Sequence, residues 1–454
     1  KKAKPTLRIH KKVSKITKTV SKFTKTVSKF TKFCVVGDLD AVVWRLFVTF
    51  AENFRKKVLS SERNCNEKDK TRDEGRQMKT EVRKVISKQD MADFVRLPRS
   101  IYRGVAQYVP DLERDTADIF RTKRNSGLDF SDVQPFVAYS DGVPVGRIVG
   151  IVNRKANDRW QQRVVRFGML EFVDDQDVSR ALLDAVARWG QSLGMDTLQG
   201  PMGITDFDKE GMLVEDFHLT GTMNTIWNPD YYPRHMEALG FQKAVDWVQI
   251  RIQIPEEVPV RYSRTAQYVR EQMGLRVVKL GDAGIDTRHY GRQTLQLFNE
   301  AYKPIFGFSA LSETQIDDYL DRYLPLADKQ MVPIVLNQQN EVVGAAVTIG
   351  SLTKALQKAN GRLWPTGWYH LLKALKWRHE DTVEMLLVGV RPDCQGLGVN
   401  ALFFDDLIPI YNKYGFKWAE TGPQLEDNVR ELSQWKPLKP EYVKRRRCYK
   451  KLII

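Results

Sequence analysis

The sequence predicts an α/β (α+β) protein built from two similar halves. Short runs of alternating apolar residues, typical of strands, occur among longer stretches with the 3.6-residue apolar period of helices. The same order of elements occurs twice, in residues 78–255 and again in residues 275–454. The chain has 454 residues, of which 42% are hydrophobic and 10% aromatic, enough for two domains with cores of their own.

The first half begins with the strand pattern "EVRKV" (residues 81–85), and helical stretches follow as far as residue 120. The segment "QPFVAYSDGVPVGRIVGIVN" predicts a hairpin, because Asp141-Gly142 is a favoured two-residue turn. A strand over residues 165–173 and an amphipathic helix that ends before Gly194 come next. The strand "AVDWVQIRIQI" closes this half, and residues 256–274 are predicted to be a linker.

The second half repeats this plan. The strand "LRVVKL" (residues 275–280) precedes helical segments over residues 287–323 and a hairpin that turns near Asn340. The strand "VEMLLVGV", a glycine-containing loop and a helix from Val399 to about Tyr414 follow. The later segment "GFKWAETGP" matches "GMDTLQGP" of the first half. The identity is weak but the order is constant, which indicates duplication.

The basic charge of the chain is concentrated in residues 1–77, which hold 21 Lys and Arg against 8 Asp and Glu. The repeats "VSKITKT", "VSKFTKT" and "VSKFTKF" lie there and are typical of low-complexity, disordered sequence. One hypothesis is that these residues are a translated upstream region and that Met78 is the real start. The alternative is a basic tail for membrane or nucleic acid.

Composition also restricts the partners and the compartment. The net charge is +16, and little of it remains beyond residue 77, so no nucleic-acid face is expected in the folded part. The sequence contains no run of about 18 apolar residues, the length that a membrane-spanning helix needs, so no membrane partner is predicted. The four cysteines lack metal-ligand spacing, so we expect no metal and a reducing, cytoplasmic location.

The loop Gln395-Gly396-Leu397-Gly398 lies between an apolar strand and a helix, where backbone N–H groups and the helix dipole attract an anion. A phosphate-binding loop of the G-x-x-x-x-G-K-[ST] kind is absent from the sequence. Gly396, Gly398 and Ala401 satisfy the dinucleotide fingerprint, with Glu420 about 20 residues on. Only about 50 residues follow, too few for that domain. A β–α turn without a ligand is the remaining alternative.

The segment "CQGLGVNA" resembles the pyrophosphate loop of the GNAT superfamily of N-acetyltransferases, whose motif is (Q/R)-x-x-G-x-(G/A). The resemblance covers residues 78–454 and implies two tandem GNAT-like domains, each a mixed, mostly antiparallel sheet flanked by helices. It implies acetyl-CoA as co-substrate, with the pantetheine arm on Val388 and Val390. The residues implied for the pyrophosphate are Gln395, Gly396, Leu397, Gly398, Val399 and Asn400; the last departs from the motif.

The first half departs further from the family. Asp174, Asp175 and Asp177 precede its helix without any glycine, and their charges would repel a pyrophosphate. The sequence therefore predicts that residues 78–255 are a degenerate copy without a cofactor loop, that residues 275–454 bind the acyl-CoA, and that the first copy builds part of the substrate cleft.

The resemblance implies direct attack of an amine on the thioester, for which Glu384 has the position of the family's glutamate base. Many relatives use a tyrosine acid, but Trp435 stands at its place, and Tyr442 and Tyr449 are unsupported substitutes. The predicted function is an N-acyltransferase acting on a small-molecule or peptide amine. The alternative is a catalytically silent acyl-CoA-binding or scaffolding protein.

One aromatic segment has two interpretations. In "NGRLWPTGWYHLLKALKW", Trp364, Trp368 and Tyr369 with Arg362 are suited to receive a planar or acidic group. Ordinary packing of a loop and a helix explains the same cluster.

Overall fold

The computed structural model describes residues 80–377 and 380–453. The predictions for residues 1–77 lie outside these ranges. Within them, no helix combines the length and apolar composition needed to cross a lipid bilayer.

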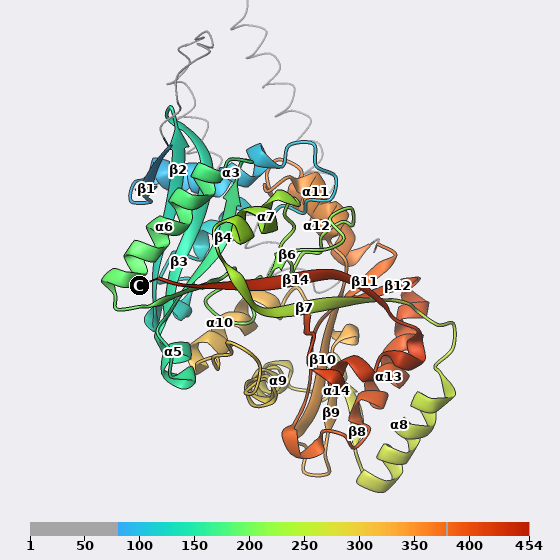
Figure 1. The fold of residues 1–454 in the computed structure, drawn as a ribbon. Coiled ribbons are helices and arrows are strands. Elements are labelled where there is room, and N and C mark those ends of the chain that lie inside the picture. The colour runs from blue at the N-terminus through green and yellow to red at the C-terminus, as the bar shows by residue number, and fades with distance from the viewer. Residues whose placement is uncertain (1–79, 378–379, 454) are drawn as a thin grey trace, which may run out of the picture. The chain divides into compact units, whose positions relative to one another are not determined.

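The first half has the predicted order of elements (Figure 1). The hairpin turns at Asp141-Gly142, where both residues have positive φ angles of 48° and 77°, as its turn type requires. In chain order the elements are β1 (Thr80–Lys84), α3 (Lys88–Ile101), α4 (Glu113–Asp118), η1 (Ser126–Asp129), β2 (Ser131–Ser140), β3 (Val143–Asn153), α5 (Arg154–Trp160), β4 (Val164–Phe172), α6 (Gln176–Ser192), β5 (Thr197–Gly200), β6 (Met212–Leu213), α7 (Tyr231–Ala238) and β7 (Gln242–Gln253).

The second half repeats that order, but two helices precede the strand that leads to the loop, where the first half has α5 alone. Its elements are α8 (Val260–Met273), β8 (Arg276–Lys279), α9 (Thr287–Ala301), α10 (Glu313–Tyr323), η2 (Lys329–Met331), β9 (Pro333–Leu336), β10 (Val342–Gly350), α11 (Thr353–Ala359), α12 (Gly367–Lys376), β11 (Thr382–Val390), η3 (Pro392–Cys394), α13 (Val399–Tyr414), β12 (Trp418–Thr421), β13 (Gln424–Leu425), α14 (Val429–Ser433), η4 (Lys436–Leu438) and β14 (Glu441–Leu452).

The strands form one continuous mixed sheet, and most neighbours are antiparallel, as predicted. Its order is β1-β2-β3-β4-β5-β14-β7-β12-β11-β10-β9-β8, with β6 also pairing with β14 and β13 with β7. The parallel pairs are β4 with β5 and β11 with β12. Each half therefore has one parallel pair at the same place in its own order, which agrees with duplication.

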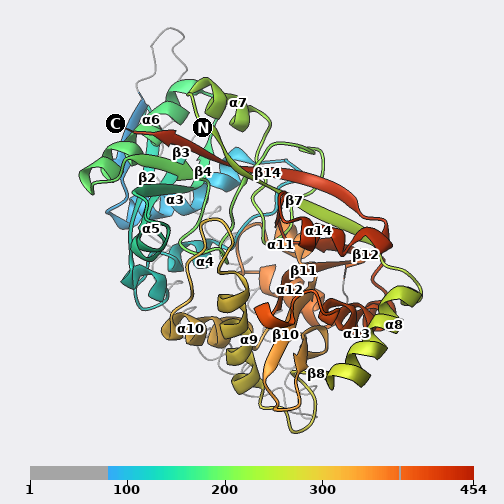
Figure 2. The ribbon, with the colours of Figure 1, turned by 60° about the horizontal axis from the view of Figure 1, so that its bottom comes forward.

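The halves exchange their last strands. β7 belongs to the first half by sequence but pairs with β12, and β14 belongs to the second half but pairs with β5. These two strands also pair with each other over most of their length, as Figures 1 and 2 show. The domain ranges 78–255 and 275–454 remain a prediction, since each range holds a strand that completes the sheet of the other.

The exchanged strands also supply core residues to the other half. Ile250 and Ile252 of β7 are buried in the core formed by α8, α13 and the second half of the sheet. Tyr449 of β14 is buried in the core under α6. Exchange therefore contributes buried apolar area as well as ladder hydrogen bonds.

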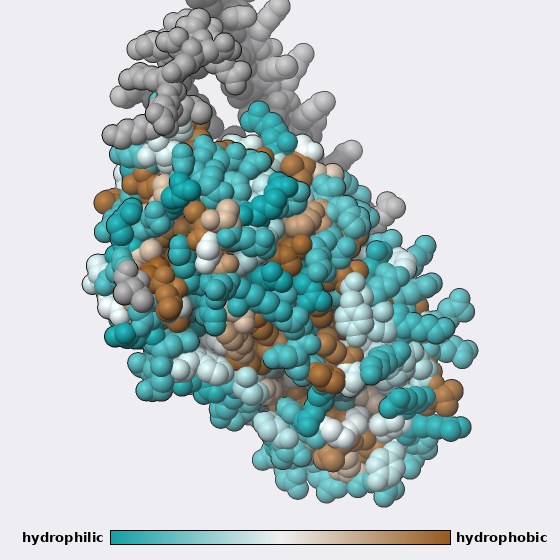
Figure 3. Space-filling model, in the orientation of Figure 1, coloured by the Kyte–Doolittle hydropathy of each residue, from teal (hydrophilic) through white to brown (hydrophobic). Residues whose placement is uncertain are grey.

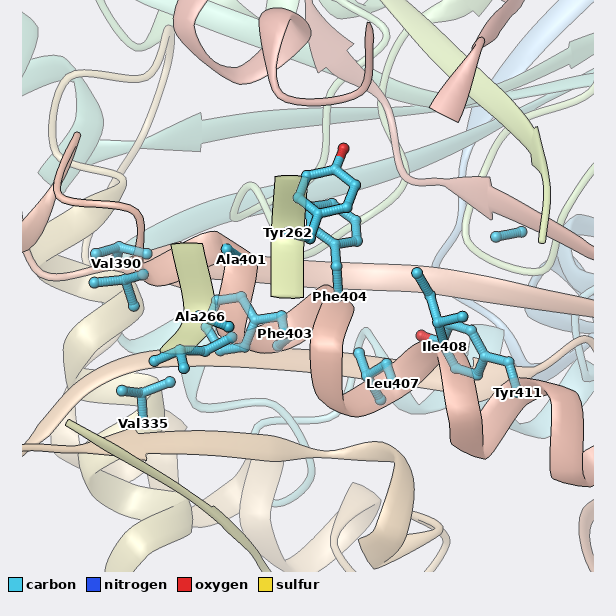
Figure 4. Packing of buried hydrophobic residues seen from close by; sticks show 14 of the residues in the cluster. Tyr262, Ala266, Val335, Val390, Ala401, Phe403, Phe404, Leu407, Ile408 and Tyr411 are labelled. Atoms are coloured by element: carbon cyan, nitrogen blue, oxygen red, sulfur yellow. The ribbon is translucent and has the colours of Figure 1, made fainter. Parts of the chain in front are cut away.

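The residues predicted to be a linker, 256–274, contain helix α8. Its residues Tyr262, Ala266 and Val269 are buried against α13, and the Tyr262 ring stacks on Phe404 with ring centres 4.6 Å apart (Figure 4). The spacing of these three residues is that of one helix face. The surrounding sequence "RYSRTAQYVREQ" is otherwise polar, which concealed the pattern.

Candidate functional site

The strands β11 and β12 pair only at their beginnings and then separate. Their parallel ladder runs from Thr382 to Met385, and the N–H of Gly422 donates to the Met385 carbonyl (2.8 Å) at its end. The pairing of β11 with β10 skips Leu386, which is a β-bulge at this point. A bulge bends its strand and is frequent next to active sites. The rest of β11 therefore presents one backbone edge that β12 does not cover.

The glycine loop connects this strand to α13. Gly396 and Gly398 have φ angles of 81° and 88°, and Gly398 caps α13 without any side-chain cap bond. The amides of Gly396, Gly398, Val399 and Asn400 donate to no group in the described part of the chain. The first turn of α13 also holds no acidic residue. Free donors at the positive end of a helix dipole suit an anion.

Two half-buried polar side chains beside this loop each have an unused hydrogen-bonding atom. Asn400, the residue that departs from the motif, donates from Nδ2 to Gln434 Oε1 (2.6 Å). Its Oδ1 and the Nε2 of Gln434 are buried without a partner among the described residues. A buried polar atom without a partner is costly, so a ligand that reaches both atoms would be stabilised by them.

The backbone groups expected to face pantetheine already have partners. The Tyr302 hydroxyl donates to the Val388 carbonyl (2.9 Å) and accepts from the Val388 N–H (3.3 Å). The Gln395 side chain donates to the Val390 carbonyl (3.0 Å). Tyr302 therefore occupies the uncovered edge of β11 as a peptide group would. No local pattern marks Tyr302, because it follows α9 as an ordinary cap residue in "NEAYKP".

Glu384 lies on β11 within the parallel ladder and is only 2% exposed. Ser351 donates to its Oε1 (2.8 Å), while Oε2 has no partner among the described residues. Burial raises the pKa of Glu384 to about 7, and the neighbouring Glu420 adds to this rise. The bond from Ser351, the charge of Lys444 and the backbone of Met223 oppose it. A carboxyl that titrates near neutral pH is suited to general-base chemistry.

A charged network lies behind Glu384. Lys444 of β14 forms an ion pair with Glu420 of β12, and burial lowers the pKa of Lys444. Gln249 of β7 donates to Glu420 (3.1 Å) and accepts from Arg446 (3.0 and 3.1 Å). Burial also lowers the pKa of Arg446, to about 9. The exchanged strands β7 and β14 thus provide the wall behind the candidate base. The sequence did not indicate Lys444, because it belongs to a basic run at the end of the chain.

The equivalent place in the first half has different chemistry. Arg166 is the third residue of β4 in the parallel ladder of β4 with β5. Glu384 is the third residue of β11 in the parallel ladder of β11 with β12, so the two residues are equivalent. Its guanidinium donates to the carbonyls of Gly307 (2.6 Å) and Gly203 (3.2 Å). A guanidinium offers N–H donors and no acceptor, so this position holds no base in the first half.

The helix start in the first half is also satisfied by the chain itself. The Asp175 carboxylate accepts from the N–H groups of Asp177 (2.8 Å) and Val178 (3.4 Å). The Tyr231 hydroxyl donates to the carbonyl of Phe172 on β4 (2.6 Å), and the N–H of Phe172 donates to the Tyr232 hydroxyl (2.9 Å). This half therefore has a capped, acidic helix start where the second half has free amides.

The two halves thus share one order of elements, one parallel pair each and a bulged strand before a helix. This is the order of elements that the resemblance to the GNAT superfamily implies. No model of a known protein family matches the chain.

Two curated proteins are similar to this chain in sequence. Protein YghO of Escherichia coli is 25% identical over 394 residues, which cover 82% of this chain and 95% of that protein. A bacterial ceramide synthase of Caulobacter vibrioides is 24% identical over 311 residues, which cover 67% of this chain and 79% of that protein.

Solved GNAT structures align along most of the chain. A tandem GNAT protein from the clavulanic acid biosynthesis pathway covers 83% of this chain and 99% of its own, at 11% identity and a TM-score of 0.49. A GNAT protein from Sphaerobacter thermophilus covers 82% of this chain and 96% of its own, at 13% identity and a TM-score of 0.44.

The remaining candidate residues lie elsewhere. Trp435 is buried in the core of the second half and donates to Gln424 (3.2 Å). Tyr449 is buried in the core of the first half, and Tyr442 is half-exposed on β14. Neither tyrosine hydrogen-bonds to Glu384 or to the loop. Among the described residues, no group of three or more His, Cys, Asp or Glu is arranged to hold a metal ion.

Proposed function

We propose that the protein is an acyl-CoA-dependent N-acyltransferase with one site, in its second half. The observation that carries this proposal is one strand, β11, that bears a buried carboxyl at its paired end and leads into a row of free amides at the start of α13. The free amides of Gly396, Gly398, Val399 and Asn400, within the predicted loop from Gln395 to Asn400, would hold the diphosphate of coenzyme A. Coenzyme A, when bound, supplies an acyl group activated as a thioester.

The side chains of the site would then move two protons. Glu384 accepts a proton from the acceptor amine as the nitrogen forms its bond to the acyl carbon. The carbon–sulfur bond breaks, and the leaving thiolate takes up a proton. Tyr302 lies at the uncovered edge of β11, and burial keeps its pKa well above 10, so it remains a proton donor. We assign the return of the proton to this hydroxyl.

The name of one curated relative supports a class of acceptor. A ceramide is the amide of a fatty acid with a long-chain amino alcohol, so the name of the Caulobacter protein describes amide formation on such an amine. We propose a long-chain amine as acceptor, to be screened beside small amines and peptides. Acetyl-CoA and long-chain acyl-CoA, offered separately, test the donor.

A catalytically silent acyl-CoA-binding protein is the second candidate. It is favoured by the partners that Val388 and Val390 already have and by the near-complete burial of Glu384. Both candidates bind acyl-CoA, and only the first forms an amide. Mass spectrometry of the amide product distinguishes them.

We expect the loop to distinguish a charged from a neutral side chain at Gly396. A Cβ there would meet no atom within 4 Å, whereas one at Gly398 would lie 2.6 Å from Thr265 of α8. Asn and Asp both tolerate positive φ, so Gly396→Asn and Gly396→Asp form a matched pair. The added carboxylate should weaken acyl-CoA binding by about 100-fold or more relative to Gly396→Asn, since two charges about 4 Å apart repel by about 4 kcal/mol at such a site.

Isothermal titration calorimetry measures both affinities, and equal melting temperatures of the free variants show that folding is unaffected. Saturating ligand at about 100 times Kd should raise the stability of the parent chain by roughly 2.7 kcal/mol. Equal affinities in the Asn and Asp variants would place the diphosphate away from the loop.

Tyr302→Phe should have opposite effects on binding and turnover. The phenylalanine cannot bond the edge of Val388, so the ligand no longer displaces two hydrogen bonds of about 1 kcal/mol each. Acyl-CoA should bind about 10-fold more tightly, while kcat falls. Stopped-flow binding and steady-state turnover measure the two effects. Weaker binding together with unchanged kcat would contradict both roles of Tyr302.

A further inference from the structure

The pair of helices α11 and α12, with the turn between them, carries charge of one sign. Residues 351–377 contain no Asp or Glu. Arg362 pairs with Glu113 (3.0 Å) and Lys354 lies 4.0 Å from Glu380, but Lys358, Lys373 and Lys376 form no ion pair with a described residue. The five basic residues of this hairpin are Lys354, Lys358, Arg362, Lys373 and Lys376.

The same hairpin exposes large aromatic side chains. Trp364, Trp368 and Tyr369 are 40–43% exposed, and Trp377 is 58% exposed. The outer face of α12 combines these rings with lysines, because Trp368, Leu372 and Lys376 follow each other at intervals of one helical turn. Apolar residues also reach the surface elsewhere (Figure 3), so the exposure of these rings does not by itself indicate a binding surface. The distinctive feature is that one short helix combines aromatic rings with lysines that form no ion pair within the described part of the chain.

The hairpin is fixed to the rest of the protein on its other side. Gln357 donates to the carbonyl of Ala106 (2.7 Å), and the N–H of Glu113 donates to the carbonyl of Gly361 (2.8 Å). Ser351, which precedes α11, donates to Glu384. The exposed rings therefore belong to an anchored element that begins at the candidate base.

We propose that the α11–α12 hairpin binds the surface of an anionic lipid bilayer. Trp and Tyr rings are suited to the boundary between head groups and acyl chains, and lysines extend from that depth to lipid phosphates. Each Lys or Arg near an anionic surface adds to the attraction. The sequence predicted no membrane partner because it lacks a long apolar run. Binding to the surface of a bilayer needs no spanning helix, so that prediction does not exclude this proposal. The proposal builds on the proposed function, because a long-chain amine would enter from that surface.

Flotation of the full chain with vesicles tests this binding without any acyl donor. Vesicles of about 70% phosphatidylcholine and 30% phosphatidylglycerol should bind the protein, and pure phosphatidylcholine vesicles should bind it at least 10-fold less. The variant Trp368→Ala with Lys376→Glu should lose at least 10-fold in binding to anionic vesicles. The control Tyr268→Ala with Lys417→Glu makes the same kinds of change at exposed residues on α8 and before β12, and should bind as the parent does.

A second measurement separates the hairpin from the basic residues 1–77, which are present in every variant. Vesicles with brominated acyl chains should quench the tryptophan fluorescence of the parent. They should quench the fluorescence of the double variant Trp368→Phe with Trp377→Phe clearly less. Equal flotation of the hairpin variant and the parent would overturn the proposal and assign binding to residues 1–77. Failure of the parent to bind would overturn it as well. Acylation of a water-soluble amine by the hairpin variant reports on the proposed function separately.

Discussion

Replacing Glu384 with glutamine should lower turnover by about 10²–10⁴-fold, the usual loss when a general base is removed. The amide keeps the shape of the side chain and can still bond Ser351, but it cannot accept a proton. Acyl-CoA affinity should stay nearly constant, because the loop amides are on the other end of β11. Steady-state kinetics with a saturating amine measure the first effect, and calorimetry measures the second.

The pH dependence of turnover should follow the ionisation of Glu384. Burial raises its pKa from an ordinary 4.5 to about 7, and the carboxylate is the active form. The rate of the parent should therefore rise as pH increases through about 7 and then level off. In Glu384→Gln this rise should disappear, leaving only the slower increase that comes from deprotonation of the amine itself.

Stability should change with pH in the opposite direction. The folded protein holds the Glu384 proton more tightly than the unfolded chain does, so the free energy of unfolding falls as pH rises from about 4.5 to 7. A shift of this size corresponds to roughly 3 kcal/mol. The glutamine variant should gain up to that amount above pH 7 and almost nothing below pH 4.5. Urea unfolding at pH 4.5 and pH 8 measures the difference.

Glu431 provides a matched control for both effects. It is a second carboxyl, half-buried on α14, and desolvation raises its pKa to about 7 as well. Glu431→Gln should gain stability above pH 7 in the same way while keeping the pH dependence of turnover. If that variant loses the dependence and Glu384→Gln keeps it, Glu431 is the base.

A chain that stops at residue 255, and one that begins at residue 256, should each fail to fold cooperatively. The first lacks β14, which lies between β5 and β7, and the second lacks β7, which covers the free side of β12. Each also loses core residues, among them Tyr449 in one case and Ile250 in the other. Circular dichroism during urea titration should show no cooperative transition for either piece.

The control is the full chain with a protease site inserted between Glu256 and Glu257, both exposed. After cleavage the two pieces should stay associated and unfold in a single transition. Cooperative unfolding of residues 1–255 alone would show that β14 is dispensable to the first half.

Local patterns in the sequence were sufficient for many elements of the fold. Asp141-Gly142 marked one hairpin, and the glycines at both ends of α13, Gly398 and Gly415, have the positive φ angles that made its limits visible. The loop was found because glycine spacing before a helix is a local signal.

The remaining features depend on contacts between distant residues. β14 has the sequence "EYVKRRRCYKKL", whose charges conceal a strand, because Lys444 and Arg446 are buried only through partners on β12 and β7. The partner of Tyr302, Val388, is far along the chain, and no local pattern announces their contact. The strand exchange is likewise a matter of pairing, which periodicity does not report.

The position of β14 between β5 and β7 also fixes when the protein can finish folding during its synthesis. Domains made first usually fold first. Here the first half has to wait for a strand that is made about 240 residues after β5. At about 5–20 residues per second, that delay is roughly 12–50 s. During this time β5 and β7 expose unpaired edges on the nascent chain, where a chaperone or a neighbouring chain is able to bind them.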